Sequence, residues 1–225
     1  MYLPLLRSHS LNRKDTHMLM LRVFSLILTL VIVLAGTRPS QAQQPPADAT
    51  LNALSASEAA AGWTLLFDGR TLSGWTQLGE ADWRVEDGTM TATKGTGFLV
   101  TPKPYENFEL KVDFWASGTV NSGVFLRCGE GNPGPRTCYE VQIEGDTTGT
   151  LVNVQPLPSG LPNAIGKWNT YEIRAEGDRV SVKINGTTTA DVQDPRLTSG
   201  SIALQEGGLS KFGLVRFRNV KVRPL

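Results

Sequence analysis

Histidine is missing from the whole of the sequence beyond residue 42. The chain of 225 residues has two histidines, His9 and His17, and both lie near its start. A protein that loses this leading segment can hold neither a Ser-His-Asp triad nor a Cys-His pair, and it can bind no metal through imidazole. Acid–base chemistry in such a protein falls to carboxylates, tyrosine, lysine or bound water.

An excess of positive charge is also missing. Five of the 22 basic residues and one of the 21 acidic residues fall within the first 42 residues, which leaves a net charge of −3 for the remainder. Proteins that bind nucleic acid or anionic membranes neutralise phosphates with clustered lysine and arginine. We therefore expect no nucleic-acid partner.

Residues 1–42 have the layout of a secretory signal peptide. Basic residues precede an apolar stretch from Val23 to Ala35, and Ser40-Gln41-Ala42 fits the small-x-small pattern of a cleavage site. The alternative is an uncleaved anchor, but 13 residues are too few to span a bilayer comfortably. We therefore expect cleavage near Ala42, a periplasmic or secreted bacterial protein, and no stable membrane insertion of the mature chain.

Cysteine is scarce, and the two that occur are Cys128 and Cys138. In an exported protein, a pair ten positions apart suggests a disulfide. The alternative is a free nucleophilic thiol, which would lack a histidine partner and would be oxidised in that compartment. We expect a structural disulfide between the two residues.

Long amphipathic helices are absent after residue 62. Residues 43–53 are rich in proline, alanine and glutamine, which is typical of a flexible linker. The capping-box pattern from Ser55 to Glu58 predicts one short helix over about residues 55–61. Beyond it, short alternating segments separated by turn signals such as Asp87-Gly88 and Asn185-Gly186 predict an all-β sandwich formed by residues 54–225.

The stretch from Asn121 to Asp146 contains an unusual polar pattern. In a strand, Glu140, Gln142 and Glu144 share one face, because side chains alternate. If the apolar rows of both strands face the core, Phe125 and Arg127 of the preceding strand lie on that same outer, concave surface. The stretch then forms a polar site on the sheet. The alternatives are a solvated sheet face for the acids and amide, and a structural ion pair for Arg127.

The cysteine pair complicates this register. In a regular antiparallel ladder with Cys128 opposite Cys138, Arg127 would face Tyr139 and the polar rows would separate. Hydrophobic patterning sets the register wherever one face of a sheet is buried. We therefore expect a bulge or an offset disulfide, with Arg127 beside Glu140.

Tryptophan is the remaining candidate for contact with a ligand. Trp115 falls on the polar face of its strand, beside Asp113 and Lys111, where it could stack on a ligand ring or pack into the structure. The other four tryptophans are expected in the core, and they are Trp63, Trp75, Trp83 and Trp168.

Several short motifs in this order resemble the 3-keto-disaccharide hydrolase family, also known as domain of unknown function 1080. They are GWTLLFDGRTLSGW (62–75), WRVEDGTM (83–90), NFEL (107–110), NSGVFLR (121–127), YEVQI (139–143), WNTYEI (168–173), ING (184–186), IALQ (202–205) and VRFRNVKV (215–222). The resemblance covers residues 54–225. It implies a concanavalin A-like jelly-roll sandwich of two antiparallel sheets, in agreement with the strand pattern.

The resemblance also implies a reaction. Family members are exported, often beside an oxidoreductase that oxidises a sugar at C3, and they cleave the resulting 3-keto-glycosides or 3-keto-disaccharides. The C3 ketone acidifies the C2 proton, so that deprotonation, elimination at C1 and addition of water complete the cleavage. This route differs from the two-carboxylate displacement of ordinary glycosidases. It suits a protein without histidine, since a carboxylate base and a cationic electrophile suffice.

We interpret the protein as a glycoside hydrolase or lyase acting on 3-keto-sugars, with Glu140 as general base and Arg127 stabilising the enolate. Substrate binding is assigned to Asn121, Gln142, Glu144, Gln205 and Trp115. No cofactor is assigned, and a divalent metal is left open. Some family members carry a histidine after the LQ motif, where this chain has Glu206 and Gly207. The alternative function is a non-catalytic carbohydrate-binding module.

Overall fold

The computed structural model describes residues 50–207 and 211–225. Their regular elements are β-strands, apart from one helical turn and one short 3-10 helix. None of the helices in this described part is long and apolar enough to cross a membrane. The expected signal peptide, and the expected linker as far as residue 49, lie outside the described residues.

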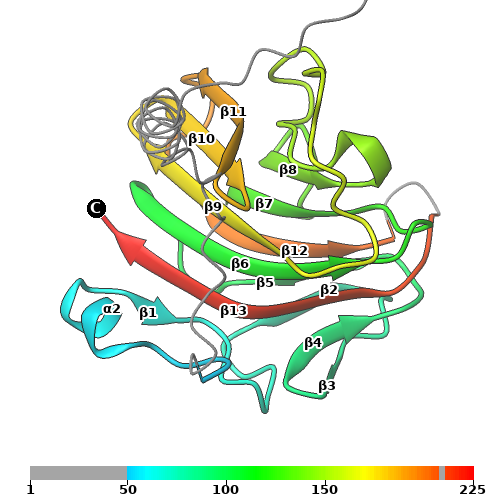
Figure 1. Cartoon of the computed structure of the whole chain (residues 1–225). Coiled ribbons are helices and arrows are strands. Elements are labelled where there is room, and N and C mark those ends of the chain that lie inside the picture. The colour runs from blue at the N-terminus through cyan, green and yellow to red at the C-terminus, as the bar shows by residue number, and fades with distance from the viewer. Residues whose placement is uncertain (1–49, 208–210) are drawn as a thin grey trace, which may run out of the picture. The chain divides into compact units, whose positions relative to one another are not determined.

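The larger sheet has eight strands, and the long strands β6 and β13 lie side by side in it (Figure 1). The spatial order of seven of them is β11, β10, β9, β6, β13, β4, β3, and β1 pairs with β13. Their bounds are β1 Thr64–Leu65, β3 Arg84–Glu86, β4 Thr89–Ala92, β6 Phe108–Ala116, β9 Asn169–Glu176, β10 Arg179–Ile184, β11 Thr187–Gln193 and β13 Val215–Pro224.

The smaller sheet has five strands in the spatial order β2, β5, β12, β7, β8. Their bounds are β2 Thr76–Gly79, β5 Gly97–Val100, β7 Ser122–Cys128, β8 Tyr139–Ile143 and β12 Ser201–Glu206. Every strand pairing in both sheets is antiparallel. The expected all-β sandwich of two antiparallel sheets is confirmed.

Alternation along the strands builds the core between the two sheets. Strand β6 alternates strictly between buried and half-buried residues, and its inward side chains join those of the smaller sheet in one apolar cluster. Tyr171 of β9 stacks near Phe114, with ring centroids 4.5 Å apart, and its hydroxyl donates a 2.5 Å hydrogen bond to the carbonyl of Gln142 in β8. This buried bond fixes β8 of the smaller sheet against the larger one.

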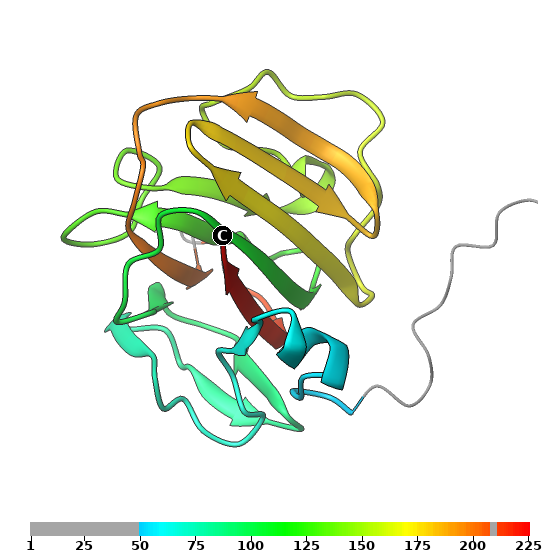
Figure 2. The same ribbon diagram turned by 90° about the vertical axis from the view of Figure 1, so that its left-hand side faces the viewer.

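The N-terminal helix α2 spans Ala56–Ala60 and lies beside β13 (Figure 2). Its capping box is complete, because the Ser55 hydroxyl accepts from the Glu58 amide and the Glu58 carboxylate accepts from the Ser55 amide. Lys221 of β13 pairs with Glu58. Asn52, in the segment expected to be linker, exchanges two hydrogen bonds with Asn219, so the folded domain includes that residue.

The two cysteines are joined in a disulfide, and a bulge precedes it in β7. Ser201 pairs with Cys128 and Ala203 pairs with Phe125, so β7 has one residue more than β12 between these two pairs. Arg127 has a positive φ of 51°, a left-handed conformation that such a bulge accommodates. Both the disulfide and the expected bulge are confirmed.

Breaking this disulfide should lower stability by an amount set by its short loop. Closing a loop between Cys128 and Cys138 restricts the unfolded chain, which is worth about 2–3 kcal/mol. We expect the double variant Cys128→Ser/Cys138→Ser to lose that much free energy of unfolding in urea titrations under oxidising conditions. Wild-type protein under reducing conditions serves as the control and should match the variant. Equal stability of oxidised wild type and variant would contradict the prediction.

Candidate functional site

The outer face of the five-stranded sheet carries most of the polar residues expected at the site. In the antiparallel register, Phe125 of β7 faces Glu140 of β8, and Gly123 faces Gln142. On the other side of β7, Ala203 of β12 faces Phe125, so Gln205 lies beside Gly123. We call the outer-face residues Gln205, Gly123 and Gln142 the central row.

Gly123 leaves the middle of the central row without a side chain. A Cβ atom at this position would lie 3.1 Å from the Phe125 ring and 3.2 Å from Cγ of Glu140. Both distances are tighter than ordinary van der Waals contact, so both side chains lean over the glycine. Glu140 is thereby brought above the centre of the row.

Glu140 is a nearly buried carboxylate without a partner. It is only 7% exposed, and no other described residue donates a hydrogen bond to it or forms a salt bridge with it. Burial raises the pKa of Glu140 to about 7, and the negative charge of Glu144 adds to the effect. At neutral pH this carboxyl group can therefore take up or release a proton.

Glu144 organises the other end of the site. One of its oxygens accepts hydrogen bonds from the side-chain amides of Asn121, at 3.1 Å, and Gln142, at 2.8 Å. Its second oxygen pairs with the ammonium group of Lys211. Because Glu144 reaches back to Gln142 and Glu140 leans over Gly123, the two carboxylates converge on the central row.

Two amide oxygens in the central row have no partner. Gln142 and Gln205 are each 8% exposed, and no hydrogen bond from any described residue reaches the Oε1 atom of either side chain. A buried acceptor left unsatisfied costs about 1–3 kcal/mol, so such atoms in native proteins commonly serve a function. Both oxygens are themselves shielded from solvent, so a ligand reaches them only when the amide side chain turns outward.

An apolar patch borders the central row on the same face. The rings of Phe98 and Phe125 meet edge to face, with centroids 5.4 Å apart, and they cluster with Ala203 and the disulfide. The site therefore combines a desolvated carboxylate with apolar surface. Such an environment favours the neutral form of an acid and strengthens electrostatic interactions within it.

The expectation that Arg127 shares this face with Glu140 is wrong. The guanidinium of Arg127 donates to the carbonyls of Glu106, Gly177 and Leu197 at 2.7–2.9 Å, and the side chain is fully buried. The physical reason is the bulge. Arg127 is itself the extra residue, so Cys128 follows Phe125 on the outer face and Arg127 turns toward the loops of the larger sheet.

Trp115 also lies away from the site. It pairs with Arg216 on the outer face of the eight-stranded sheet, whereas Glu140 lies on the outer face of the other sheet. Its expected contact with the same sugar as Glu140 is therefore wrong. The reason is that alternation places a residue on the polar face of its own strand but does not say which sheet the strand joins.

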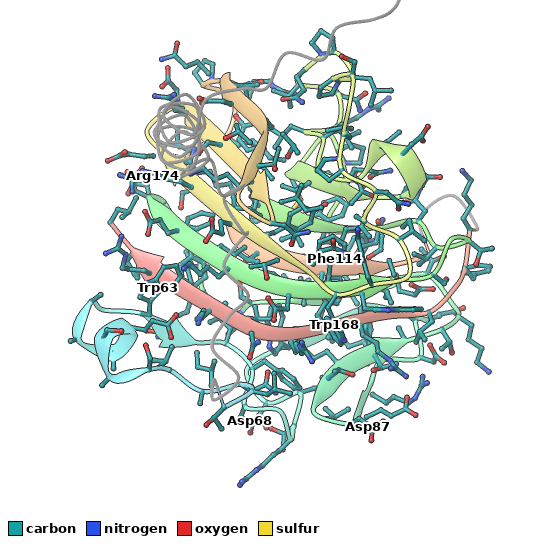
Figure 3. All side chains as sticks on the ribbon, in the orientation of Figure 1. Trp63, Asp68, Asp87, Phe114, Trp168 and Arg174 are labelled. Atoms are coloured by element: carbon teal, nitrogen blue, oxygen red, sulfur yellow. A yellow bond between two sulfur atoms is a disulfide. The ribbon has the colours of Figure 1, made fainter. Side chains whose placement is uncertain are left out.

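Of the four tryptophans expected in the core, only Trp83 is fully buried, and Trp75 packs against the core from its edge. Trp63 and Trp168 instead contact cations on the larger sheet (Figure 3). Arg218 lies 3.8 Å from the centroid of the Trp168 ring. For these two residues the expectation was wrong.

A hollow of about 250 Å³ lies on the outer face of the larger sheet. Trp63 and Arg174 both line it (Figure 3). Its charged groups largely satisfy one another, since Glu109 pairs with both Arg174 and Arg223. Both acids that line this hollow, Glu109 and Glu172, pair with cations, and we therefore place the candidate site on the outer face of the other sheet.

Sequence reasoning missed Lys211 and the strongly buried Glu206. Lys211 lies in the connection between β12 and β13, and only the fold brings it to Glu144. Glu206 is fully buried, its Oε1 accepts from the Gly213 amide at 3.3 Å, and its Oε2 has no partner among the described residues. Burial raises the pKa of Glu206 to about 7, with a contribution from Asp82. The only sign of Glu206 in the sequence was an acidic residue at the end of the alternating segment IALQE (202–206).

The described residues offer no ready metal centre. Within residues 50–207 and 211–225, no three histidine, cysteine or acidic side chains gather as a metal-binding group would require. The oxygens near the central row belong to two carboxylates and three amides, of which Glu144 is already saturated by Asn121, Gln142 and Lys211. We therefore derive no metal-dependent chemistry from this site.

Comparison with known protein families agrees with the motifs and the fold. Residues 62–223 match the family of 3-keto-alpha-glucoside-1,2-lyase-like domains. The chain belongs to this family. The family resemblance seen in the sequence motifs is thus confirmed over almost the whole of the described domain. No curated protein matches the chain.

Among the solved structures with a similar fold are three from bacteria. A candidate glycosyl hydrolase from Parabacteroides distasonis is similar with a TM-score of 0.69 at 24% identity, covering 78% of this chain and 100% of its own. A second from the same organism has a TM-score of 0.56 at 24% identity and covers 72% and 99%. A carbohydrate binding module from Bacillus subtilis has a TM-score of 0.51 at 17% identity and covers 67% and 95%. At these identities the likenesses show the jelly-roll fold.

Replacing Arg127 should affect folding. In Arg127→Met, the carbonyls of Glu106, Gly177 and Leu197 lose the charged donor that the buried guanidinium supplies, at a cost of about 1–3 kcal/mol each. We expect the free energy of unfolding to fall by at least about 3 kcal/mol in denaturant titrations. Arg136→Met, at an exposed position, is the matched control and should be neutral. Unchanged stability of Arg127→Met would refute the assignment.

Glu140 should destabilise the fold at high pH. Its folded-state pKa of about 7 lies above the usual 4.5, so the native state favours the protonated acid and loses stability as pH rises from about 4.5 to about 7. Glu140→Gln removes this penalty. We expect the variant to be more stable than wild type at pH 8, on the order of 1–3 kcal/mol, and no more stable below pH 4.5. Thermal melts across this pH range measure the difference, with exposed Glu130→Gln as control.

Proposed function

We propose that this protein cleaves the glycosidic bond of 3-keto-glycosides at the central row of the five-stranded sheet. The observation that carries the proposal is Glu140, a carboxylate that is nearly buried, has no partner among the described residues and has a pKa of about 7. Membership of a family of 3-keto-alpha-glucoside-1,2-lyase-like domains supports this substrate class. The similar structure of a candidate glycosyl hydrolase is in keeping with it.

Glu140 acts as the general base. A ketone at C3 acidifies the hydrogen on C2, and the ionised Glu140 removes that proton while the C–H electron pair forms the enolate. A base with a pKa close to the working pH combines a useful ionised fraction with useful basicity. The lean of Glu140 over Gly123 leaves its carboxylate above the space where a sugar ring would lie.

Lys211 takes the electrophilic role that the sequence suggested for Arg127. Its ammonium pairs with Glu144, which reaches back to Gln142, so its positive charge lies beside the central row. A fixed cation near the C3 oxygen lowers the energy of the enolate that forms there. The amide side chains of Gln142 and Gln205 turn outward to accept from ring hydroxyls, and so hold C2 toward Glu140.

Elimination and hydration complete the reaction. The enolate electron pair re-forms the C3 carbonyl, a C1–C2 double bond appears, and the glycosidic oxygen leaves C1 with the proton held by Glu140 or by water. Water then adds its oxygen to C1 and its proton to C2, which restores the 3-keto-sugar. The net change is hydrolysis. An enzyme that oxidises sugars at C3 must supply such a substrate, which is the functional partner we expect.

Removal of the base should abolish turnover but not binding. Glu140→Gln keeps the shape of the side chain and loses its basicity, so we expect kcat on a 3-keto-glucoside to fall by about 10²–10⁴ with little change in affinity. In the wild type, kcat/KM should rise with pH up to about 7 and then level off, because the carboxylate form is the active one. A wild-type-like rate for Glu140→Gln would remove Glu140 from the mechanism.

The cation should matter for turnover as well. Lys211→Met removes the charge beside the central row, and we expect kcat to fall by on the order of 10²–10³, as for the loss of an oxyanion donor. Exposed Lys103→Met is the matched control and should leave kcat unchanged. Equal losses in both variants would point to a general effect of net charge.

The substrate provides its own control. Elimination depends on the C3 ketone, so the unoxidised glycoside should remain intact under the conditions that cleave its 3-keto form. Cleavage of both at similar rates would indicate an ordinary two-carboxylate glycosidase. Tight binding of sugar with cleavage of neither would favour the alternative function, a carbohydrate-binding module.

A further inference from the structure

Phe212 is an exposed aromatic ring next to the site and has no role in the mechanism above. It is 43% exposed, and it is the one aromatic residue among the large hydrophobic side chains that are exposed in the described part of the chain. Its ring covers Gly207, since a Cβ there would lie 2.8–2.9 Å from two ring carbons. Gly207 lies just beyond the end of β12, where its amide donates to the carbonyl of Asn121, the residue that precedes β7.

The chain around Phe212 is held against the site. The amide of Gly207 donates to the carbonyl of Asn121 at 3.2 Å, and the amide of Asn121 donates to the carbonyl of Lys211 at 3.4 Å. The next residue, Gly213, donates its amide to the Glu206 carboxylate, and Leu214 exchanges hydrogen bonds with Ser117. Phe212 is therefore fixed beside Asn121, at the Lys211 side of the site.

The spacing of the sheet tells which part of a substrate this ring can reach. Gly207 lies two residues along the strand and one strand across from Gly123, which corresponds to about 8 Å. A pyranose ring is narrower than this distance. A substrate ring held above Gly123, with its C3 oxygen toward Lys211 and its C1 toward β12, brings the group attached through the glycosidic oxygen to Phe212.

We propose that Phe212 is a specificity-determining residue on which the second sugar ring of a disaccharide substrate stacks, an inference that rests on the proposed function. The apolar face of a pyranose packs well on an aromatic ring, which presents large apolar area at little cost in conformational entropy. The side chain of Asn121 beside the ring supplies a polar partner for the edge of that sugar. A small aglycone such as methyl leaves Phe212 uncovered.

The test compares two substrates and three proteins. KM and kcat are measured on a 3-keto-disaccharide and on methyl 3-keto-glucoside with wild type, Phe212→Ala and Phe212→Trp. We expect Phe212→Ala to raise KM for the disaccharide by about tenfold with kcat nearly unchanged, and to leave the methyl glycoside unaffected. Phe212→Trp should restore the disaccharide KM. Leu225→Ala, an exposed apolar residue beside Asn107, is the matched control.

The outcomes separate this inference from the proposed function. If the wild type cleaves both substrates and Phe212→Ala leaves the disaccharide KM unchanged, or raises both KM values equally, the role of Phe212 is refuted while the mechanism stands. If the wild type cleaves neither, the proposed function fails. Calorimetric titration with the unoxidised disaccharide then decides, since equal affinities of wild type and Phe212→Ala, or no binding at all, refute the stacking role.

Discussion

The bulge at Arg127 is the constraint on which the arrangement of this site depends. One extra residue in β7 lets the strand keep its apolar side chains in the core up to Leu126 and still bring Cys128 to the outer face beside Phe125. The side chain of Arg127 donates hydrogen bonds to three carbonyls, those of Glu106 before β6, Gly177 in the β9–β10 turn and Leu197 before β12. These bonds join the two sheets at one end. The outer face beyond the bulge is left to Glu140, Gln142 and Gln205.

Two buried acidic residues, Glu140 and Glu206, lower the stability of this fold. Glu140 and Glu206 both have a pKa raised to about 7 by burial, so each opposes folding when ionised. Glu206 holds the amide of Gly213 and thereby the segment that carries Lys211. Glu140 forms no hydrogen bond or salt bridge with any described residue. A chain selected for stability alone would have an apolar or amide side chain at this position. That contrast is the physical basis for giving Glu140 the reactive role.

Local patterns were sufficient for most of the fold. The capping box at Ser55 formed its helix, alternation in β6 and β8 identified the buried residues, and the two cysteines joined as their spacing and number indicated. Glu140, Gln142, Glu144, Gln205 and Asn121 came together on one face because strand register is fixed by the buried row. The failures concern Arg127, Trp115, Trp63 and Trp168, whose surroundings are formed by segments remote in sequence.

The sandwich class, the family, the disulfide and the side chains that share a strand face could be predicted without the fold, because they follow from alternation, turn residues and short spacings. The sheet that each strand joins, the residue that forms the bulge and the cation that pairs with Glu144 could not. Those outcomes depend on pairing between distant segments. A shift of one residue in the register of a strand moves each of its side chains to the opposite face of the sheet. Lys211 and Phe212 reached the site for the same reason, because Asn121 holds the backbone around them.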